Sequence, residues 1–203
     1  MFINLSMAPI FPYNYANGRR LCCDTYYKIN ETEYMLNSLT YGFWQSELYD
    51  WIDPDHIVVW GKDGKANARE AKSRVLSGIV TGGSFLTGDN FVAPAKDSDK
   101  AFSRYEELLG NEKLIEVLKI GRPFEGVIDN KCPYASDVFT LTDEGKTYVA
   151  VFNYSKIAIK TKVLEVPSGA VAENLFTGKK QNTGKGNLTV TLQPGDSAIY
   201  EIR

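Results

Sequence analysis

The chain has 203 residues, of which 43% are hydrophobic and 24% charged, which is ordinary for a globular protein. Its net charge of −2 excludes a strongly basic surface, so we expect neither nucleic acid nor a membrane as a partner. No apolar run reaches the roughly 18 residues that a membrane span needs. The three cysteines, Cys22, Cys23 and Cys132, have no metal-ligand spacing, and we expect no metal or other cofactor.

The first 120 residues alternate between strand and helix patterns. The strands are predicted at residues 2–7, 21–23, 56–60 and 84–87, and the helices at 30–43, 66–80 and 98–118, with a break near Gly110. Asn30 is predicted to cap the first helix, with Glu33 completing a capping box. Strand and helix alternating about four times is typical of parallel βαβ units.

The pattern of alternating strands and helices ends between Gly121 and Tyr134. After this point the sequence predicts short strands rich in β-branched and aromatic residues, at 138–141, 146–154, 158–164, 171–175, 188–192 and 197–202. Turns rich in Gly, Asn, Asp and Pro separate them, which is typical of an antiparallel β-sandwich. The sequence therefore predicts an α/β domain at residues 1–120 followed by an all-β domain at residues 121–203.

Four βα units in about 118 residues amount to half of a (β/α)₈ barrel, which usually needs about 250 residues. A half barrel leaves two sheet edges and an open core. The sequence is thus consistent with the C-terminal part of a longer barrel, with a half barrel that dimerises, or with a small open sheet.

Carboxylates lie near the ends of successive predicted strands. Asp24 follows one strand, Asp53-Pro-Asp55-His56 lies just before the next, and Asp89 follows the last. Because the carboxyl ends of parallel barrel strands form one mouth, these groups are expected to converge there. Paired carboxylates are the groups that glycoside cleavage requires, one to protonate the leaving oxygen and one to attack or to activate water.

Each of these residues also has a purely structural interpretation. Arg20 lies four residues before Asp24, where it would hold a sugar hydroxyl or form an ordinary ion pair. Asp53-Pro-Asp55 is also typical of a turn with Asx hydrogen bonds, and a lone histidine such as His56 is commonly a core residue.

The order of these motifs resembles a known family. Arg20-x-x-x-Asp24, Gly42-Phe43-Trp44, Asp53-Pro-Asp55-His56 and Gly88-Asp89 resemble the C-terminal barrel half of the α-galactosidases and α-N-acetylgalactosaminidases, glycoside hydrolase families 27 and 36. The stretch from Tyr148 to Tyr200 is similar to their C-terminal antiparallel β-domain. The resemblance covers essentially the whole chain and implies a partial (β/α)₈ barrel followed by a β-sandwich.

The resemblance also implies roles for single residues. Asp24 would be the general acid/base of a retaining double displacement, and Arg20 would bind the sugar. Asp55 would lie in the sugar pocket beside His56, which replaces the usual methionine. No cofactor is implied, and the implied partner is a carbohydrate substrate.

Two departures from the family qualify these roles. Ser6-Met7-Ala8 stands where many galactosidases carry Ser-Cys-Glu, so the glutamate that would contact galactose is absent. The family's nucleophile lies in a Lys-x-Asp motif on the fourth strand, whereas this chain corresponds to the fifth strand onward. The resemblance therefore implies a fragment of an α-galactosidase-like retaining hydrolase, completed by an N-terminal barrel half in cis or by a homo-oligomer.

A non-catalytic carbohydrate-binding or accessory protein, or a truncated inactive product, is the alternative interpretation. Localisation stays open, because any export signal would lie in the missing N-terminal half.

Overall fold

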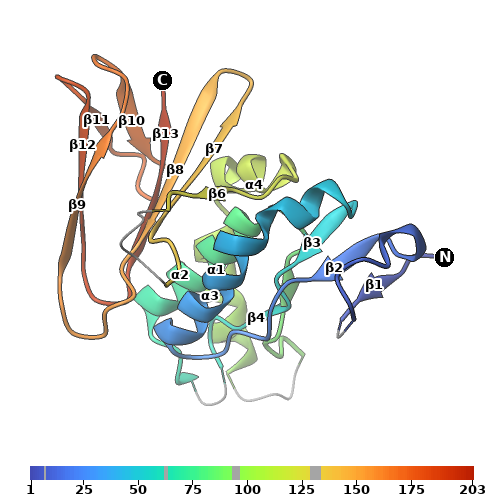
Figure 1. Cartoon of the computed structure of the whole chain (residues 1–203). Coiled ribbons are helices and arrows are strands. Elements are labelled where there is room, and N and C mark those ends of the chain that lie inside the picture. The colour runs from blue at the N-terminus through green and yellow to red at the C-terminus, as the bar shows by residue number, and fades with distance from the viewer. Residues whose placement is uncertain (7, 62–63, 93–96, 129–133) are drawn as a thin grey trace.

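The computed structural model describes residues 1–6, 8–61, 64–92, 97–128 and 134–203 (Figure 1). Its N-terminal part contains β1 (Asn4–Leu5), η1 (Tyr13–Tyr15), β2 (Gly18–Arg20), α1 (Ile29–Gly42), η2 (Phe43–Glu47), β3 (Trp51–Asp53), β4 (His56–Ile57), α2 (Ala68–Thr81), β5 (Leu86–Thr87), α3 (Ser98–Leu109) and α4 (Glu112–Lys119). Its C-terminal part contains β6 (Glu125–Gly126), β7 (Val138–Asp143), β8 (Lys146–Phe152), β9 (Lys160–Glu165), β10 (Val171–Asn174), β11 (Lys180–Asn182), β12 (Asn187–Leu192) and β13 (Ser197–Ile202). Within the described ranges, no helix is both long and apolar enough to cross a membrane.

The N-terminal strands are parallel, as the alternating pattern predicts. One sheet has the order β1-β2-β3, and β4 pairs with β5 in a second sheet. A parallel bridge between Thr25 and Ile57 joins the segment after β2 to β4. Figure 1 shows α1, α2 and α3 between these strands and the C-terminal sheets. The helices therefore cover one side of the parallel strands.

Several predicted boundaries differ from the structure. The second strand was predicted at residues 21–23, but β2 ends at Arg20. A strand was not predicted at Trp51–Asp53, because the following Pro54 was interpreted as part of a turn. The strand predicted at 56–60 is shorter, because the backbone N–H groups of Val59, Trp60 and Gly61 bond to the Asp89 carboxylate instead of to a neighbouring strand.

The first helix begins one residue before the predicted cap. Its N-cap is Lys28, and the third helical residue is Glu31 rather than Glu33. The Glu31 carboxylate accepts hydrogen bonds from the backbone N–H groups of Tyr26 at 2.8 Å, Tyr27 at 2.7 Å and Lys28 at 3.2 Å. These donors precede the helix, so one side chain fixes the loop between Asp24 and α1.

The C-terminal part is antiparallel, as predicted. Six strands form a sheet of order β11-β10-β13-β8-β7-β6, and β9 pairs with β12 in a second sheet. Apolar side chains fill the space between the sheets, including Val149, Val151, Leu188 and Val190. The predicted antiparallel β-sandwich is confirmed, and the strands β6 and β11, of two and three residues, were not predicted.

The six-stranded sheet also packs on the helices. One continuous core contains Leu36 and Leu39 of α1, Val75 and Ile79 of α2, and Phe139 and Phe152 of the sheet. The rings of Phe139 and Phe152 meet edge to face, with centroids 5.8 Å apart. The helices therefore share a core with the C-terminal sheet.

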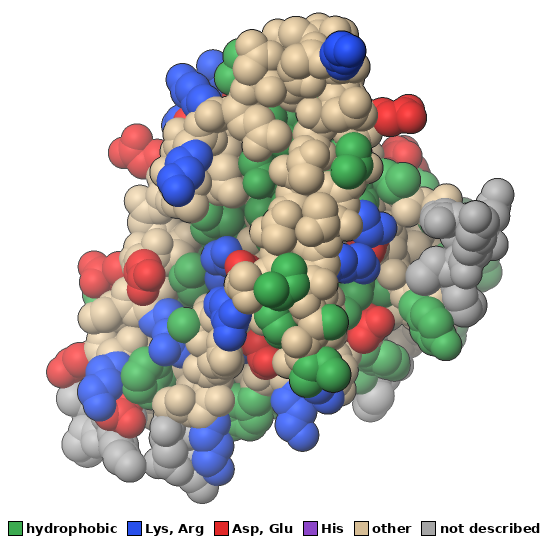
Figure 2. All heavy atoms as spheres, turned by 90° about the vertical axis from the view of Figure 1, so that its left-hand side faces the viewer, with side chains coloured by type: hydrophobic (Ala, Val, Ile, Leu, Met, Phe, Trp, Pro, Cys, Tyr) green, Lys and Arg blue, Asp and Glu red, His purple; other side chains and the backbone are tan. Residues whose placement is uncertain are grey.

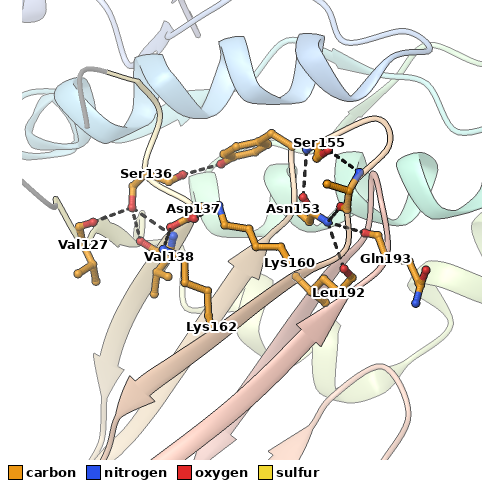
Figure 3. A network of polar contacts seen from close by, with 12 residues as sticks. Val127, Ser136, Asp137, Val138, Asn153, Ser155, Lys160, Lys162, Leu192 and Gln193 are labelled. Carbon is orange, nitrogen blue, oxygen red and sulfur yellow. Dashed lines mark hydrogen bonds and ion pairs between the residues drawn. The ribbon is translucent and has the colours of Figure 1, made fainter. Parts of the chain in front are cut away.

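A hollow of about 850 Å³ opens between β9 and the six-stranded sheet. On the side that carries β9 and β12, basic and acidic side chains lie together among hydrophobic ones (Figure 2). Figure 3 shows the polar network in this hollow, in which Lys160 and Lys162 of β9 point toward Asp137. Lys162 Nζ lies 2.7 Å from an Asp137 oxygen, and Lys160 bonds to the other. The ion pairs tie β9 to the opposite sheet.

Replacing Asp137 with asparagine is expected to lower the free energy of unfolding by about 1–2 kcal/mol at pH 7. This value is small for two ion pairs because solvent screens the partly exposed lysines. Burial alone would raise the pKa of Asp137, but the hydrogen bonds from Lys160 and Lys162 outweigh it, and the pKa is lowered. The carboxylate thus stabilises the fold above its unfolded pKa of about 3.9, and this contribution is lost as the pH falls toward the folded pKa. Urea unfolding of both proteins between pH 7 and pH 3 should show the difference shrinking; a constant difference would contradict the assignment.

Candidate active site

Most of the predicted site residues lie at or after the carboxyl ends of neighbouring parallel strands, and His56 begins β4. Arg20 is the last residue of β2 and pairs in register with Asp53, the last residue of β3. Asp55 directly precedes β4, as predicted, and it also lies two residues after the end of β3, a strand that was not predicted. The end of a parallel strand is also where barrel enzymes carry their site residues.

Three of the predicted residues come together. Ligand atoms of Asp24, Asp55 and His56 all lie within 4.8 Å of one another. The Asp24 and Asp55 carboxyls are therefore neighbours, and Arg20 forms its ion pair with Asp55, at 2.6 Å, rather than with Asp24. Asp55 is buried, Asp24 half-buried and His56 exposed, so the cluster runs from the interior to the surface.

The backbone holds Asp55 in an uncommon conformation. Its φ angle is 66°, in the left-handed region that non-glycine residues seldom occupy. The Asp53 carboxylate accepts a 2.7 Å hydrogen bond from the Asp55 N–H, and Asp55 itself accepts one of 2.9 Å from the His56 N–H. The other Asp53 oxygen bonds to the Asn4 side chain. The predicted Asx turn is therefore present, and it positions Asp55.

The two hydrogen-bonded carboxyls have opposite pKa shifts. Burial raises the pKa of Asp55 to about 6, and the hydrogen bond to Asp24 acts in the same direction. The hydrogen bond to Asp55 lowers the pKa of Asp24, and a second bond, from the Tyr26 hydroxyl, adds to this effect. Below about pH 6 the pair therefore shares one proton, which rests mainly on Asp55. Carboxyls with divergent pKa values are typical of acid/base sites.

Replacing Arg20 with glutamine should raise the pKa of Asp55 above its present value, because the guanidinium charge opposes protonation of that carboxyl. Because the pKa of Asp55 is raised, the native state binds this proton more tightly than the unfolded chain does. The stability that proton binding to Asp55 contributes is therefore lost as the pH rises from about 4 to about 6. The Asp55 ¹³Cγ shift in an NMR pH titration measures the change.

Arg19→Gln is the matched control for this titration. Arg19 bonds to the Gln45 side chain and to the carbonyls of Ala8 and Pro9, and to none of the site carboxylates. The Arg19→Gln substitution should leave the pKa of Asp55 unchanged. An Arg20→Gln protein with an unshifted Asp55 curve would show that the ion pair does not control this proton.

Tyr26 belongs to the cluster, although the sequence did not single it out. Its hydroxyl donates to Asp24, and this bond raises the pKa of Tyr26 to about 12. Asp24 and Tyr26 flank Thr25, which forms a parallel bridge. Residues two apart in an extended segment point to the same side, so this spacing was the available signal.

Asp89 has a structural role. Its carboxylate accepts from the N–H of Val59 at 2.7 Å, of Trp60 at 3.2 Å and of Gly61 at 2.7 Å. It therefore holds the loop after β4 and does not join the Asp24 cluster. Met7 of the Ser6-Met7-Ala8 motif and Cys132 lie outside the described residues.

Asp24, Asp55 and His56 are also the group that offers metal-ligand atoms among the described residues. Two carboxylates and one imidazole are suitable donors for a divalent cation. The ion pair with Arg20 and the hydrogen bond between the carboxyls already engage these groups, so the arrangement fits a proton-sharing pair better than a cation site.

The C-terminal part matches a known domain family. Residues 137–202 match the family described as the alpha galactosidase C-terminal beta sandwich domain. The resemblance to α-galactosidases is confirmed. A search of curated proteins gave no match.

Solved structures share the fold of this α-galactosidase-like chain. It matches a β-L-arabinopyranosidase of Geobacillus stearothermophilus with a TM-score of 0.74 and 18% identity, covering 94% of this chain and 45% of the enzyme. It matches α-galactosidase from Saccharomyces cerevisiae with raffinose with a TM-score of 0.64 and 14% identity, covering 93% of this chain and 59% of the enzyme. It matches the isomalto-dextranase of Arthrobacter globiformis with panose with a TM-score of 0.68 and 13% identity, covering 100% of this chain and 38% of the enzyme.

These likenesses show the fold of the chain. The chain spans about half the length of the first two enzymes and less of the third. Because the three enzymes are named for different sugars, the shared fold does not fix the sugar that this chain would recognise.

Proposed function

We propose that this chain supplies the C-terminal half of a (β/α)₈ barrel, with its β-sandwich, to a retaining α-glycosidase acting on terminal α-linked galactose-type sugars. The proposal depends on one observation above all. Asp24 and Asp55, with ligand atoms within 4.8 Å of each other, follow the parallel strands β2 and β3, and Arg20 is paired to Asp55. This is the end of a barrel at which active sites form.

In this proposal Asp24 is the general acid/base. It is half-buried, and its hydrogen bond to Asp55 connects it to the proton that the pair shares. It would pass the proton that it shares with Asp55 to the leaving oxygen, which leaves the pair without that proton, and would then take one from water in the second step. Asp55 and Arg20 would bind sugar hydroxyls, and His56, at the exposed end of the cluster, would contact the substrate from its rim.

Asp55 is too close to Asp24 to be the nucleophile. Retaining enzymes place the two carboxyl groups about 5–5.5 Å apart so that the anomeric carbon fits between them. An oxygen of Asp24 and one of Asp55 lie within 4.8 Å of each other, and Asp55 is already paired with Arg20. The nucleophile must therefore come from another segment, and the open side of the parallel strands is where an N-terminal barrel half, in cis or from a second subunit, would add it.

The first experiment is to sequence the coding DNA upstream of Met1. We expect the reading frame to continue through a strand–helix pattern with Lys-x-Asp at a strand end. An in-frame stop directly upstream, with no partner half encoded nearby, would overturn the proposal. The chain would then have the alternative function of non-catalytic sugar binding, or it would be an inactive product.

A further inference from the structure

A second cavity, of about 420 Å³, adjoins Tyr26, two residues after Asp24. Three aromatic side chains line it, those of Tyr26, Tyr27 and Trp60. Tyr26 connects the cavity to the site, because its ring lines the cavity while its hydroxyl donates to Asp24. The cavity is therefore one side chain away from the carboxyl pair.

Contacts from outside the cavity hold its aromatic walls. The Glu31 carboxylate fixes the backbone of Tyr26 and Tyr27. The Arg104 guanidinium lies 4.4 Å from the centroid of the Trp60 ring, a cation–π contact. At Gly61, whose φ is +72°, an added Cβ would come within 2.2 Å of the Tyr27 ring, so only glycine permits this approach. The cavity is thus formed without a ligand.

We infer that this cavity is the subsite for the leaving group of the glycosidase proposed above, and that it takes a neutral pyranose. The inference rests on the proposed function, because a general acid must contact the leaving oxygen, and the leaving group then lies next to Asp24. Aromatic rings pack against the apolar face of a sugar ring, and the volume is within the usual range for small-ligand sites. The described lining residues include no lysine or arginine, and their carboxylates, Asp89 and Asp97, are engaged by backbone N–H groups and by Lys100, which favours a neutral sugar over an anionic one.

NMR titration of the isotope-labelled chain tests this inference without any catalysis. Methyl β-glucopyranoside is expected to shift the Trp60 indole N–H and the Tyr26 and Tyr27 amides, with saturation at millimolar concentrations. Glucuronate, a charged pyranose, should bind more weakly, and sorbitol, which has no ring face, should cause no saturable shift.

Two variants locate the binding. Tyr26→Leu removes the ring, which is 43% exposed, and should weaken binding at least fivefold, whereas Tyr26→Phe keeps the ring and should bind normally. Tyr34→Leu is the matched control, because Tyr34 is 60% exposed on α1 and does not line the cavity. Absence of a saturable shift at Trp60, or equal loss in the Tyr34→Leu protein, would overturn the inference.

The two proposals fail in distinguishable ways. Sugar binding at Trp60 in a chain with no encoded partner half would refute the proposed hydrolase and leave a sugar site. A working hydrolase that depends on Asp24 but shows no sugar shift at Trp60 would refute the subsite alone.

Discussion

In the enzyme that carries this chain, Asp24→Asn is expected to slow the hydrolysis of glycosides with poor leaving groups by about 10² or more. The asparagine amide cannot give a proton to the leaving oxygen. Aryl glycosides whose phenolate leaves without protonation should lose far less in the first chemical step. Comparing kcat/KM for an alkyl and a dinitrophenyl glycoside measures the effect.

Asp50→Asn is the control for this measurement, since Asp50 is exposed and accepts a 3.1 Å hydrogen bond from the Asn17 side chain, outside the cluster. It should leave both rates unchanged. If Asp24→Asn slowed both substrates equally, the residue would be structural, and an unchanged rate on the alkyl glycoside would rule it out as the acid.

Replacing Gly83 with alanine should destabilise the protein by about 3 kcal/mol or more, at or above the upper end of the usual cost of overpacking. Gly83 follows α2 and lies against the end of the parallel sheet. An added Cβ would stand 1.4 Å from the carbonyl oxygen of Ile52, which belongs to β3. Backbone must move to relieve this overlap, because no flexible side chain is involved. Thermal or urea unfolding monitored by circular dichroism gives the difference.

Gly169→Ala separates steric overlap from backbone strain. Gly169 has a φ of +75°, and an added Cβ there meets nothing within 4 Å. Its substitution should cost only about 1–2 kcal/mol, the usual penalty for a left-handed conformation in an L-residue. Equal losses in the two proteins would show that the contact between Gly83 and β3 relaxes easily.

The sequence predicted the broad architecture well, because the features involved are local. Hydrophobic periodicity located α2 and the break between α3 and α4, and the β-branched segments located most strands of the sandwich. The motif order brought Arg20, Asp24, Asp55 and His56 into consideration, and the structure places them together. Their catalytic and binding roles stay predictions.

The remaining features depend on contacts between distant residues. The pairing of Arg20 with Asp55 instead of Asp24 follows from the register of β2 and β3, which periodicity does not specify. Strand β3 was missed because three residues before a proline give no clear alternation. The role of Asp89 depends on backbone groups about 30 residues away in the chain.

The core that joins α1 and α2 to the six-stranded sheet makes the two parts thermodynamically interdependent. Phe139 and Phe152 pack on the same helices that lie against the parallel strands. Loosening the sandwich would therefore lower the free energy needed to open the carboxyl pair, although neither ring is near it in the chain. The sandwich therefore stabilises the site from a distance. Substitutions that disrupt the site are expected far from Asp24 as well as beside it.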